Sequence, residues 1–218
     1  MIKAEHKKWA RILYDFYITR LLKKNFNRFL LTNNFPQVDS RSTLIITPNH
    51  FSWWDGFFVD YYTGKFLDRK IFLLMLEEQL KRFWFFSKVG AYSINPDNPK
   101  SIWETLTYSS NILSNTRNFV VFYPQGRIEP YDKRPPDLKP GLVKLIESIK
   151  SKTEIVPLAF KIIYSNNKKP DVIVRAGEKL IIDNGIIEFE MFSSAFLKTL
   201  NELDEYSLTG DEKDIFKK

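Results

Sequence analysis

His50 and Asp55 are the residues whose types and spacing point most directly to chemistry. They lie within the segment 49–55, which directly follows the apolar run 44–48. That run predicts a β-strand ending just before His50, and Asp55 falls in the first turn of the helix that should follow. The bend between them can fold the carboxylate onto one imidazole nitrogen, which raises the basicity of the other nitrogen. The pair indicates a general base for a hydroxyl group, although the same spacing also occurs among solvated loop residues.

Further segments place polar or basic residues after predicted strands or before a predicted helix. A strand at 119–123 runs into a turn at Gly126, where the main chain can approach a substrate and offer amide N–H groups to an oxyanion. An equally good role for this glycine is a turn position that no Cβ fits. Lys139 opens a predicted helix, whose first amides favour anions. Glu129 is expected only to hold Arg127 in place. The candidates outside the histidine segment are Asn95, Gln125, Gly126, Arg127 and Lys139.

These blocks, in this order and at this spacing, resemble the glycerolipid acyltransferase family, the lysophosphatidic acid acyltransferase-like enzymes. The resemblance covers roughly residues 44–160. The family's Asn-His-x-Ser-x-x-Asp block fits fully at 49–55, its Phe-Pro-Glu-Gly-Thr-Arg block corresponds to 123–127, and an apolar strand containing Val-Pro follows at 155–160. A further family block, Gly-x-x-x-Ile-x-Arg, corresponds to the segment 90–96, where Asn95 stands in place of the arginine. In the block at 123–127, Gln125 stands in place of the glutamate, and Arg127 follows Gly126 directly.

The resemblance implies an O-acyltransferase of phospholipid biosynthesis. In such an enzyme the acceptor hydroxyl attacks an acyl thioester directly, and coenzyme A or acyl carrier protein carries the acyl group. His50 would then remove the hydroxyl proton while Asp55 orients the ring. The acceptor that the resemblance implies is a lysophospholipid, with lysophosphatidic acid as the default. Asn95, Gln125, Gly126, Arg127 and Lys139 would bind the substrates.

Two alternatives remain open at this point. Asn95 and Gln125 are neutral where the family usually carries charge, which favours transfer to another polar lipid, such as a glycolipid or an amino-acid lipid. The other alternative is a catalytically idle membrane- or lipid-binding module that kept the fold. The intact pair of His50 and Asp55 argues against an idle module, because such a module has no need of it.

Composition excludes several other kinds of site. The chain of 218 residues contains no Cys, so thiolate nucleophiles, disulfides and zinc–thiolate centres are excluded. Its two histidines, His6 and His50, are too few for a multi-histidine metal site. We therefore expect no metal and no bound cofactor.

The amino-terminal segment carries most of the net charge of +7. Residues 1–31 contain eight Lys and Arg side chains against two acidic ones. Apolar residues recur there at the period of one helical face, which predicts a basic amphipathic helix lying on an anionic membrane surface. An ordinary surface helix docked on the domain is the alternative. We expect a peripheral protein on the cytoplasmic face of the membrane, with no nucleic-acid partner and no spanning helix. The apolar residues are Trp9, Ile12, Leu13, Phe16 and Tyr17.

The rest of the chain alternates between predicted strands and helices, which is typical of an α/β fold with a largely parallel or mixed sheet flanked by helices. The best candidate boundary lies at 33–36, so we expect a helical membrane-surface segment at 1–35 and a single acyltransferase domain at 36–218. In such sheets ligands bind beyond the carboxyl ends of the strands. Strands are expected at 43–48, 71–75, 90–94, 118–123, 154–163, 171–176 and 179–182, and helices at 54–64, 76–88, 98–115, 140–150 and 188–206.

Overall fold

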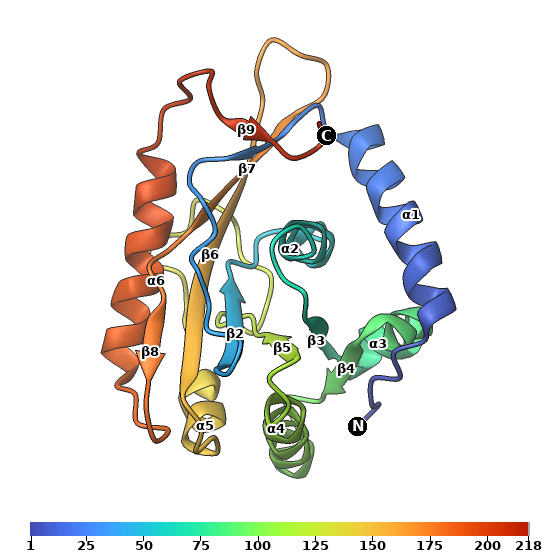
Figure 1. Ribbon diagram of the computed structural model, residues 1–218, viewed down its shortest axis with the longest axis vertical. Helices are drawn as coiled ribbons and strands as arrows, with labels where there is room; N and C mark the ends of the chain where they lie inside the picture. The colour runs from blue at the N-terminus through green and yellow to red at the C-terminus, as the bar shows by residue number, and fades with distance from the viewer. Residues whose placement is uncertain (218) are drawn as a thin grey trace.

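The computed structural model describes residues 1–217 and contains a nine-stranded mixed sheet with helices on both faces (Figure 1). The strands are β1 (Phe29–Leu31), β2 (Thr43–Pro48), β3 (Lys70–Leu76), β4 (Ala91–Ile94), β5 (Asn118–Val121), β6 (Thr153–Ile163), β7 (Asp171–Ala176), β8 (Leu180–Ile182) and β9 (Lys213–Asp214). The helices are α1 (Lys8–Asn25), α2 (Asp55–Thr63), α3 (Glu77–Arg82), the 3₁₀ helix η1 (Trp84–Val89), α4 (Pro99–Leu113), α5 (Gly141–Glu147) and α6 (Phe189–Asp204).

The sheet is parallel on one side and mixed on the other. The order is β4-β3-β5-β2-β6-β7-β1-β9, with β8 paired to β6. The five strands from β4 to β6 are parallel to one another, because helices connect most of them. β7 pairs antiparallel with β6, and β1 then pairs parallel with β7. The expected α/β fold with a largely parallel or mixed sheet and an amino-terminal helix is confirmed.

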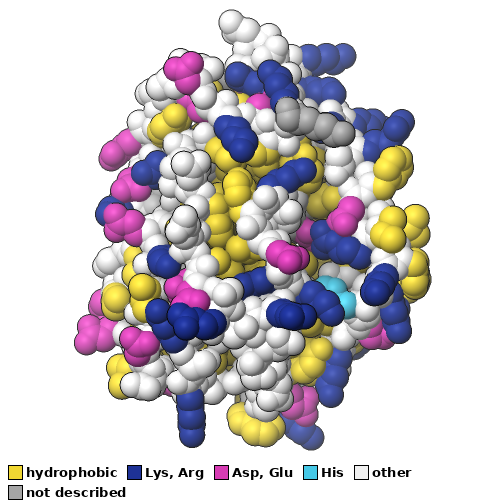
Figure 2. All heavy atoms as spheres, viewed as in Figure 1, with side chains coloured by type: hydrophobic (Ala, Val, Ile, Leu, Met, Phe, Trp, Pro, Cys, Tyr) yellow, Lys and Arg dark blue, Asp and Glu magenta, His cyan; other side chains and the backbone are white. Residues whose placement is uncertain are grey.

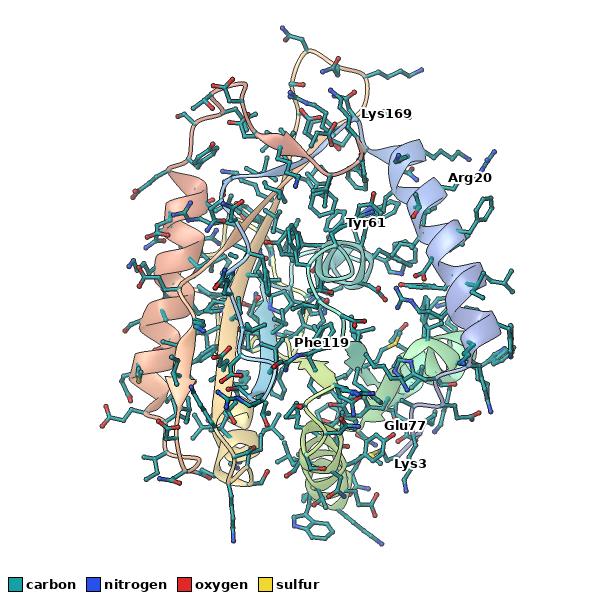
Figure 3. The ribbon with its side chains drawn as sticks, viewed as in Figure 1. Lys3, Arg20, Tyr61, Glu77, Phe119 and Lys169 are labelled. Atoms are coloured by element: carbon teal, nitrogen blue, oxygen red, sulfur yellow. The ribbon has the colours of Figure 1, made fainter. Side chains whose placement is uncertain are left out.

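Each face of the sheet buries its own apolar layer. One layer joins side chains of α1, α2 and η1 to one face of the strands, and the other joins α4, α5 and α6 to the opposite face. Figure 1 shows α1 and α6 on opposite sides of the molecule. Figure 3 shows Tyr61 of α2 and Phe119 of β5 inside the layer that α1 covers, whereas Arg20 projects outward from α1. Each layer supplies the apolar burial that holds its helices to the sheet.

Several predicted elements have different bounds in the structure. The helix expected at 76–88 is divided into α3 and η1. Gly90 directly follows η1, and its φ of 114° is costly for any residue with a Cβ. The helical segment expected at 1–35 contains a helix that ends at Asn25. Residues 29–31 are three buried apolar residues that pair with β7 instead. The first segment of the predicted division therefore contributes a strand to the sheet, and the division itself stays a prediction.

Helix α1 is attached to the domain by the side that the sequence pattern did not single out. Its buried residues are Ala10, Tyr14, Ile18 and Leu22. Residues 1–7 lie along β4 and η1, where the amide and carbonyl of Ile2 bond to Ser93 and the amide of Glu5 donates to the Ser87 carbonyl. The predicted apolar face is exposed to solvent in the structure. No helix within residues 1–217 has the length and apolar character needed to cross a membrane.

Candidate active site

The loop that carries His50 leaves the carboxyl end of β2, beside the loop that leaves β5. The two strands are parallel neighbours, so both loops emerge at the same edge of the sheet. Asn49 fixes the first loop to β6, because its side-chain amide donates to the Phe160 carbonyl at 2.9 Å and its oxygen accepts from the Phe160 amide at 2.8 Å. No role for Asn49 was predicted from the sequence, although this residue directly precedes His50.

The Asp55 carboxylate organises the whole turn around His50. It is fully buried at the start of α2, and its Oδ2 lies 2.8 Å from Nδ1 of His50. The same oxygen accepts hydrogen bonds from the amides of Phe51 and Ser52 at 2.7 and 2.9 Å. Its Oδ1 accepts the Ser52 hydroxyl at 2.7 Å. With Nδ1 held as the donor, Nε2 of His50 is left as the basic nitrogen of the ring.

The His50 ring is held by stacking as well as by hydrogen bonding. Its side chain remains 23% exposed, and the ring of Tyr123 stacks against it with centroids 4.2 Å apart. The Tyr123 hydroxyl is buried without a hydrogen-bond partner among residues 1–217, and burial raises the pKa of this phenol well above its usual value. Tyr123 therefore stays neutral and acts on His50 through its ring. The sequence gives no signal that separates it from an ordinary strand residue.

Gln125 contacts the backbone of His50, and Gly126 forms the turn that follows it. Gln125 is 4% exposed, and its Oε1 accepts the His50 amide at 2.6 Å. The Gly126 amide donates to the Tyr123 carbonyl at 3.1 Å, which closes a turn and removes this N–H from the groups available to an oxyanion. The φ of 69° explains the glycine. Of the two roles considered for Gly126, the structure shows the turn.

Arg127 and Lys139 meet at one carboxylate on the surface of the site. Nη2 of Arg127 lies 3.2 Å and Nζ of Lys139 lies 2.7 Å from the same oxygen of Asp137. Both cations are more than half exposed. The Asp137 carboxyl has a lowered pKa, first because Lys139 donates a hydrogen bond to it and then because Lys133 and Arg127 are close. Arg127 and Lys139 thus form a surface cluster of two cations around one carboxylate.

Asn95 lies apart from this cluster. It follows β4, and two strands, β3 and β5, separate β4 from β2 in the sheet. Its side-chain oxygen accepts the Asp97 amide at 3.1 Å and its backbone amide donates to Ser101, so the residue shapes the entry to α4. Within residues 1–217 no hydrogen bond joins Asn95 to the other candidate residues. The structure therefore does not bring it to the site that the other candidates share.

Across residues 1–217, no group of three or more His, Cys, Asp or Glu side chains is placed to hold a metal ion. The site instead consists of a carboxylate-held imidazole on a rigid turn, beside two exposed cations. This arrangement suits proton abstraction from a hydroxyl whose own molecule carries a negative group.

The comparisons with known proteins define the class of enzyme. The acyltransferase family matches residues 28–161, which is more than half of the chain and includes every candidate site residue. The chain belongs to this family and is an acyltransferase. Its fold is similar to the crystal structure of the 1-acyl-sn-glycerophosphate (LPA) acyltransferase PlsC from Thermotoga maritima. The TM-score is 0.56 at 13% identity, and the match covers 91% of this chain and 85% of that chain. A comparison with curated proteins finds no match in sequence.

Proposed function

We propose that the protein transfers a fatty acyl group from a thioester to the hydroxyl of a lysophospholipid at a membrane surface. The observation that carries this proposal is the His50 ring, held at Nδ1 by the buried Asp55 and partly exposed to solvent. The thioester donor is acyl-coenzyme A or acylated acyl carrier protein. Membership of the acyltransferase family supports acyl transfer, and the likeness to PlsC supports the fold.

The residues of the turn define the order of proton and bond transfers. Nε2 of His50 takes the proton from the acceptor hydroxyl as its oxygen bonds to the thioester carbon. The tetrahedral intermediate then expels the thiolate, and the imidazolium of His50 passes the proton to that sulfur. Asp55 stabilises the charged ring between these steps. An acyl-enzyme is not needed, because the chain has no Cys and the Ser52 hydroxyl is committed to Asp55.

The acceptor that best fits the surface of the site carries a phosphate. Arg127 and Lys139 already hold the Asp137 carboxylate between them, and a phosphate presents more charge and more oxygens to the same two cations. A phosphate-free polar lipid was favoured by the neutral Asn95 and Gln125. The first lies apart from the site and the second contacts the His50 backbone, so neither supports that alternative. Lysophosphatidic acid is the simplest acceptor of this kind.

The exposed face of α1 supports binding to a membrane surface. Figure 2 shows hydrophobic side chains beside Lys and Arg on the edge of the molecule that α1 forms. An apolar helix face flanked by basic residues lies stably at the interface of an anionic bilayer, and the cytoplasmic leaflet is anionic. Two more aromatic side chains are exposed. Trp53 lies in the turn between His50 and Asp55, and Trp84 belongs to η1. The exposed apolar residues of α1 are Trp9, Ile12, Leu13, Phe16 and Tyr17.

The test is thioester consumption by the purified full-length chain. The donor is acyl-coenzyme A or acylated acyl carrier protein. It is supplied with lysophosphatidic acid or with a phosphate-free lysolipid, in anionic vesicles. Thiol release and product mass are measured together. We expect a diacyl product from lysophosphatidic acid that disappears with His50→Ala. Transfer only to the phosphate-free acceptor would contradict the proposed acceptor. Absence of transfer to any lysolipid would leave the idle-module alternative.

A further inference from the structure

Gln125 contacts the backbone of His50 on both sides of that residue. Its Oε1 accepts the His50 amide at 2.6 Å, and its Nε2 lies 3.4 Å from the His50 carbonyl. The side chain is almost fully buried, so it has no surface to offer an acceptor. A primary amide can both accept from an N–H and donate to a C=O at this position without carrying a charge.

Glu129 holds Gln125 in this orientation. Its buried Oε2 accepts Nε2 of Gln125 at 3.3 Å and the Asp137 amide at 3.0 Å. Its own amide donates to the His50 carbonyl at 3.0 Å, so the two residues together make three contacts with the His50 backbone. Burial alone raises the pKa of Glu129, but hydrogen bonds from Lys133, Asp137 and Gln125 outweigh it and lower the pKa to about 2. The group is therefore a fixed negative charge.

We propose that Gln125 and Glu129 form a brace that positions His50, and that the charge of Glu129 is why residue 125 is Gln and not Glu. The inference rests on the proposed role of His50 as general base. Gln125 is then a positioning residue that makes no contact with the acceptor. Recognition of the headgroup then belongs to the exposed cations Arg127 and Lys139.

A glutamate at position 125 would place one carboxylate oxygen within about 3.3 Å of Glu129 and about 3.4 Å of the His50 carbonyl. The carboxylate oxygens of residues 125 and 129 and the His50 carbonyl oxygen would then be three hydrogen-bond acceptors with no donor among them. Two buried carboxylates at this distance share one proton, so the pair binds it at a higher pH than either group alone. The protonated acid can donate to Glu129 as the amide does, so acid should restore the brace. The other charged groups around the pair are Arg127 and Lys133 on Glu129, Lys139 on Asp137, and Asp55 on His50.

The decisive experiment compares the wild type with Gln125→Glu, Glu129→Gln and the double variant that exchanges the two side chains. We expect Gln125→Glu to lower kcat by about 10–100-fold, the range that loss of a charge-assisted hydrogen bond implies, while the KM for the acceptor changes less than about threefold. The loss should shrink as the pH is lowered from 8 to 6. The double variant should regain at least about fivefold in kcat over Gln125→Glu, because one amide again faces one carboxylate.

A Gln125→Met variant separates the brace from a general loss of packing, since Met has a similar volume and no charge. Its kcat should fall without the pH dependence of Gln125→Glu. A rise in KM for the acceptor at unchanged kcat in Gln125→Glu would assign the residue to recognition and overturn the brace. A double variant no more active than Gln125→Glu would also overturn it.

Imidazole NMR tests the brace independently of the acceptor. The chain has two histidines, so ¹⁵N-labelled imidazole gives two sets of signals, and His6→Gln identifies those of His50. Gln125→Glu should shift the His50 signals at pH 8 and return them toward the wild type at pH 6, with the His6 signals unmoved. Unchanged His50 signals would overturn the brace even if transfer is observed. Absence of transfer to any lysolipid by the wild type, together with this shift in Gln125→Glu, would instead contradict the proposed function alone.

Discussion

The Asp55 carboxylate does two tasks, because it orients the His50 ring and also closes the turn that carries it. Its bonds to the amides of Phe51 and Ser52 would be lost with the side chain, and each unpaired buried amide costs about 1–3 kcal/mol. Substitutions of the two residues should therefore differ in what they damage.

We predict that His50→Ala lowers kcat by about 10²–10⁴-fold and leaves thermal unfolding nearly unchanged, because the ring is at the surface of the turn. Asp55→Ala should lose activity to a similar degree and also lower the melting temperature by several degrees. Asp55→Asn, which keeps the acceptor oxygen for the amides, should separate the two effects. Thioester kinetics and thermal denaturation of the same preparations check this. Wild-type turnover in His50→Ala would contradict the mechanism.

Asp137 competes with the acceptor for Arg127 and Lys139 if the acceptor carries a phosphate. Arg127→Ala should then lower kcat/KM for lysophosphatidic acid by about 10–100-fold, whereas Asp137→Asn should lower the KM. A phosphate-free lysolipid is the matched control, and neither substitution should change its kinetics by more than about twofold. Equal effects of Arg127→Ala on both acceptors would remove the residue from headgroup recognition.

Glu129 also predicts how stability depends on pH. Its pKa is lowered to about 2 in the folded protein from the usual 4.5, so the folded state is favoured wherever this group is ionised. The contribution is fully present above about pH 4.5 and is lost as the pH falls toward 2. Urea unfolding from pH 6 to 3 should show a smaller loss of stability in Glu129→Gln than in the wild type. Parallel curves for the two proteins would contradict the assignment.

At the scale of elements, the sequence predicts the strands and helices whose apolar pattern fits one kind of element with one buried face. β2 and β7 have the expected bounds, because short buried apolar runs between turns favour strands. Helix α1 has two apolar faces, one through Tyr14 and Ile18 and one through Ile12 and Phe16, and periodicity alone does not show which face meets the core. β1 could not be predicted, since its three residues become a strand only by pairing with β7, far along the chain.

The same limit applies to the site. The bond between His50 and Asp55 follows from local spacing and could be predicted. Gln125 could be placed near His50 but not oriented, because its partner Glu129 is one of many charges in its loop. Asn95 was predicted at the site from position in a motif, whereas the order of strands puts two strands, β3 and β5, between β4 and β2.

Element bounds also decide how membrane binding can be tested. Deleting residues 1–31 removes β1 and the buried Phe26 and Phe29, so we predict an unfolded product instead of a soluble domain. The informative variant is Ile12→Ser with Phe16→Ser, since both side chains are 70% exposed. It should co-sediment several-fold less with anionic vesicles while its circular dichroism is unchanged.

The matched control is Tyr164→Ser with Ile186→Ser, which removes two exposed apolar side chains from segments outside α1. This control should bind vesicles as the wild type does, and salt should weaken binding of both proteins. Equal binding by the α1 variant and the control would contradict the proposed interfacial role of α1.

At the scale of the whole molecule, one buried ion pair joins α1 to the helix that begins with Asp55. Nη1 and Nη2 of Arg11 donate to the Asp60 carboxylate of α2, at 2.9 and 2.5 Å, and Arg11 also bonds to Asp15. Burial raises the pKa of Asp60 and the Arg11 bonds oppose that rise. A carboxylate left in this place without its partner would be an uncompensated buried charge.

Arg11→Met should therefore destabilise the protein by about 3–5 kcal/mol at pH 8, the cost of breaking a buried pair from one side. With Arg11 removed, the pKa of Asp60 in the folded state rises further above its unfolded value. Stability is therefore retained where Asp60 is protonated and is lost as the pH rises through the pKa of Asp60 in the folded state. The variant should thus be more stable to urea at pH 5 than at pH 8. Arg11→Met combined with Asp60→Leu should recover most of the loss and remove this pH dependence, because an apolar pair replaces the charges. A double variant no more stable than Arg11→Met would contradict the role given to the unpaired Asp60 charge.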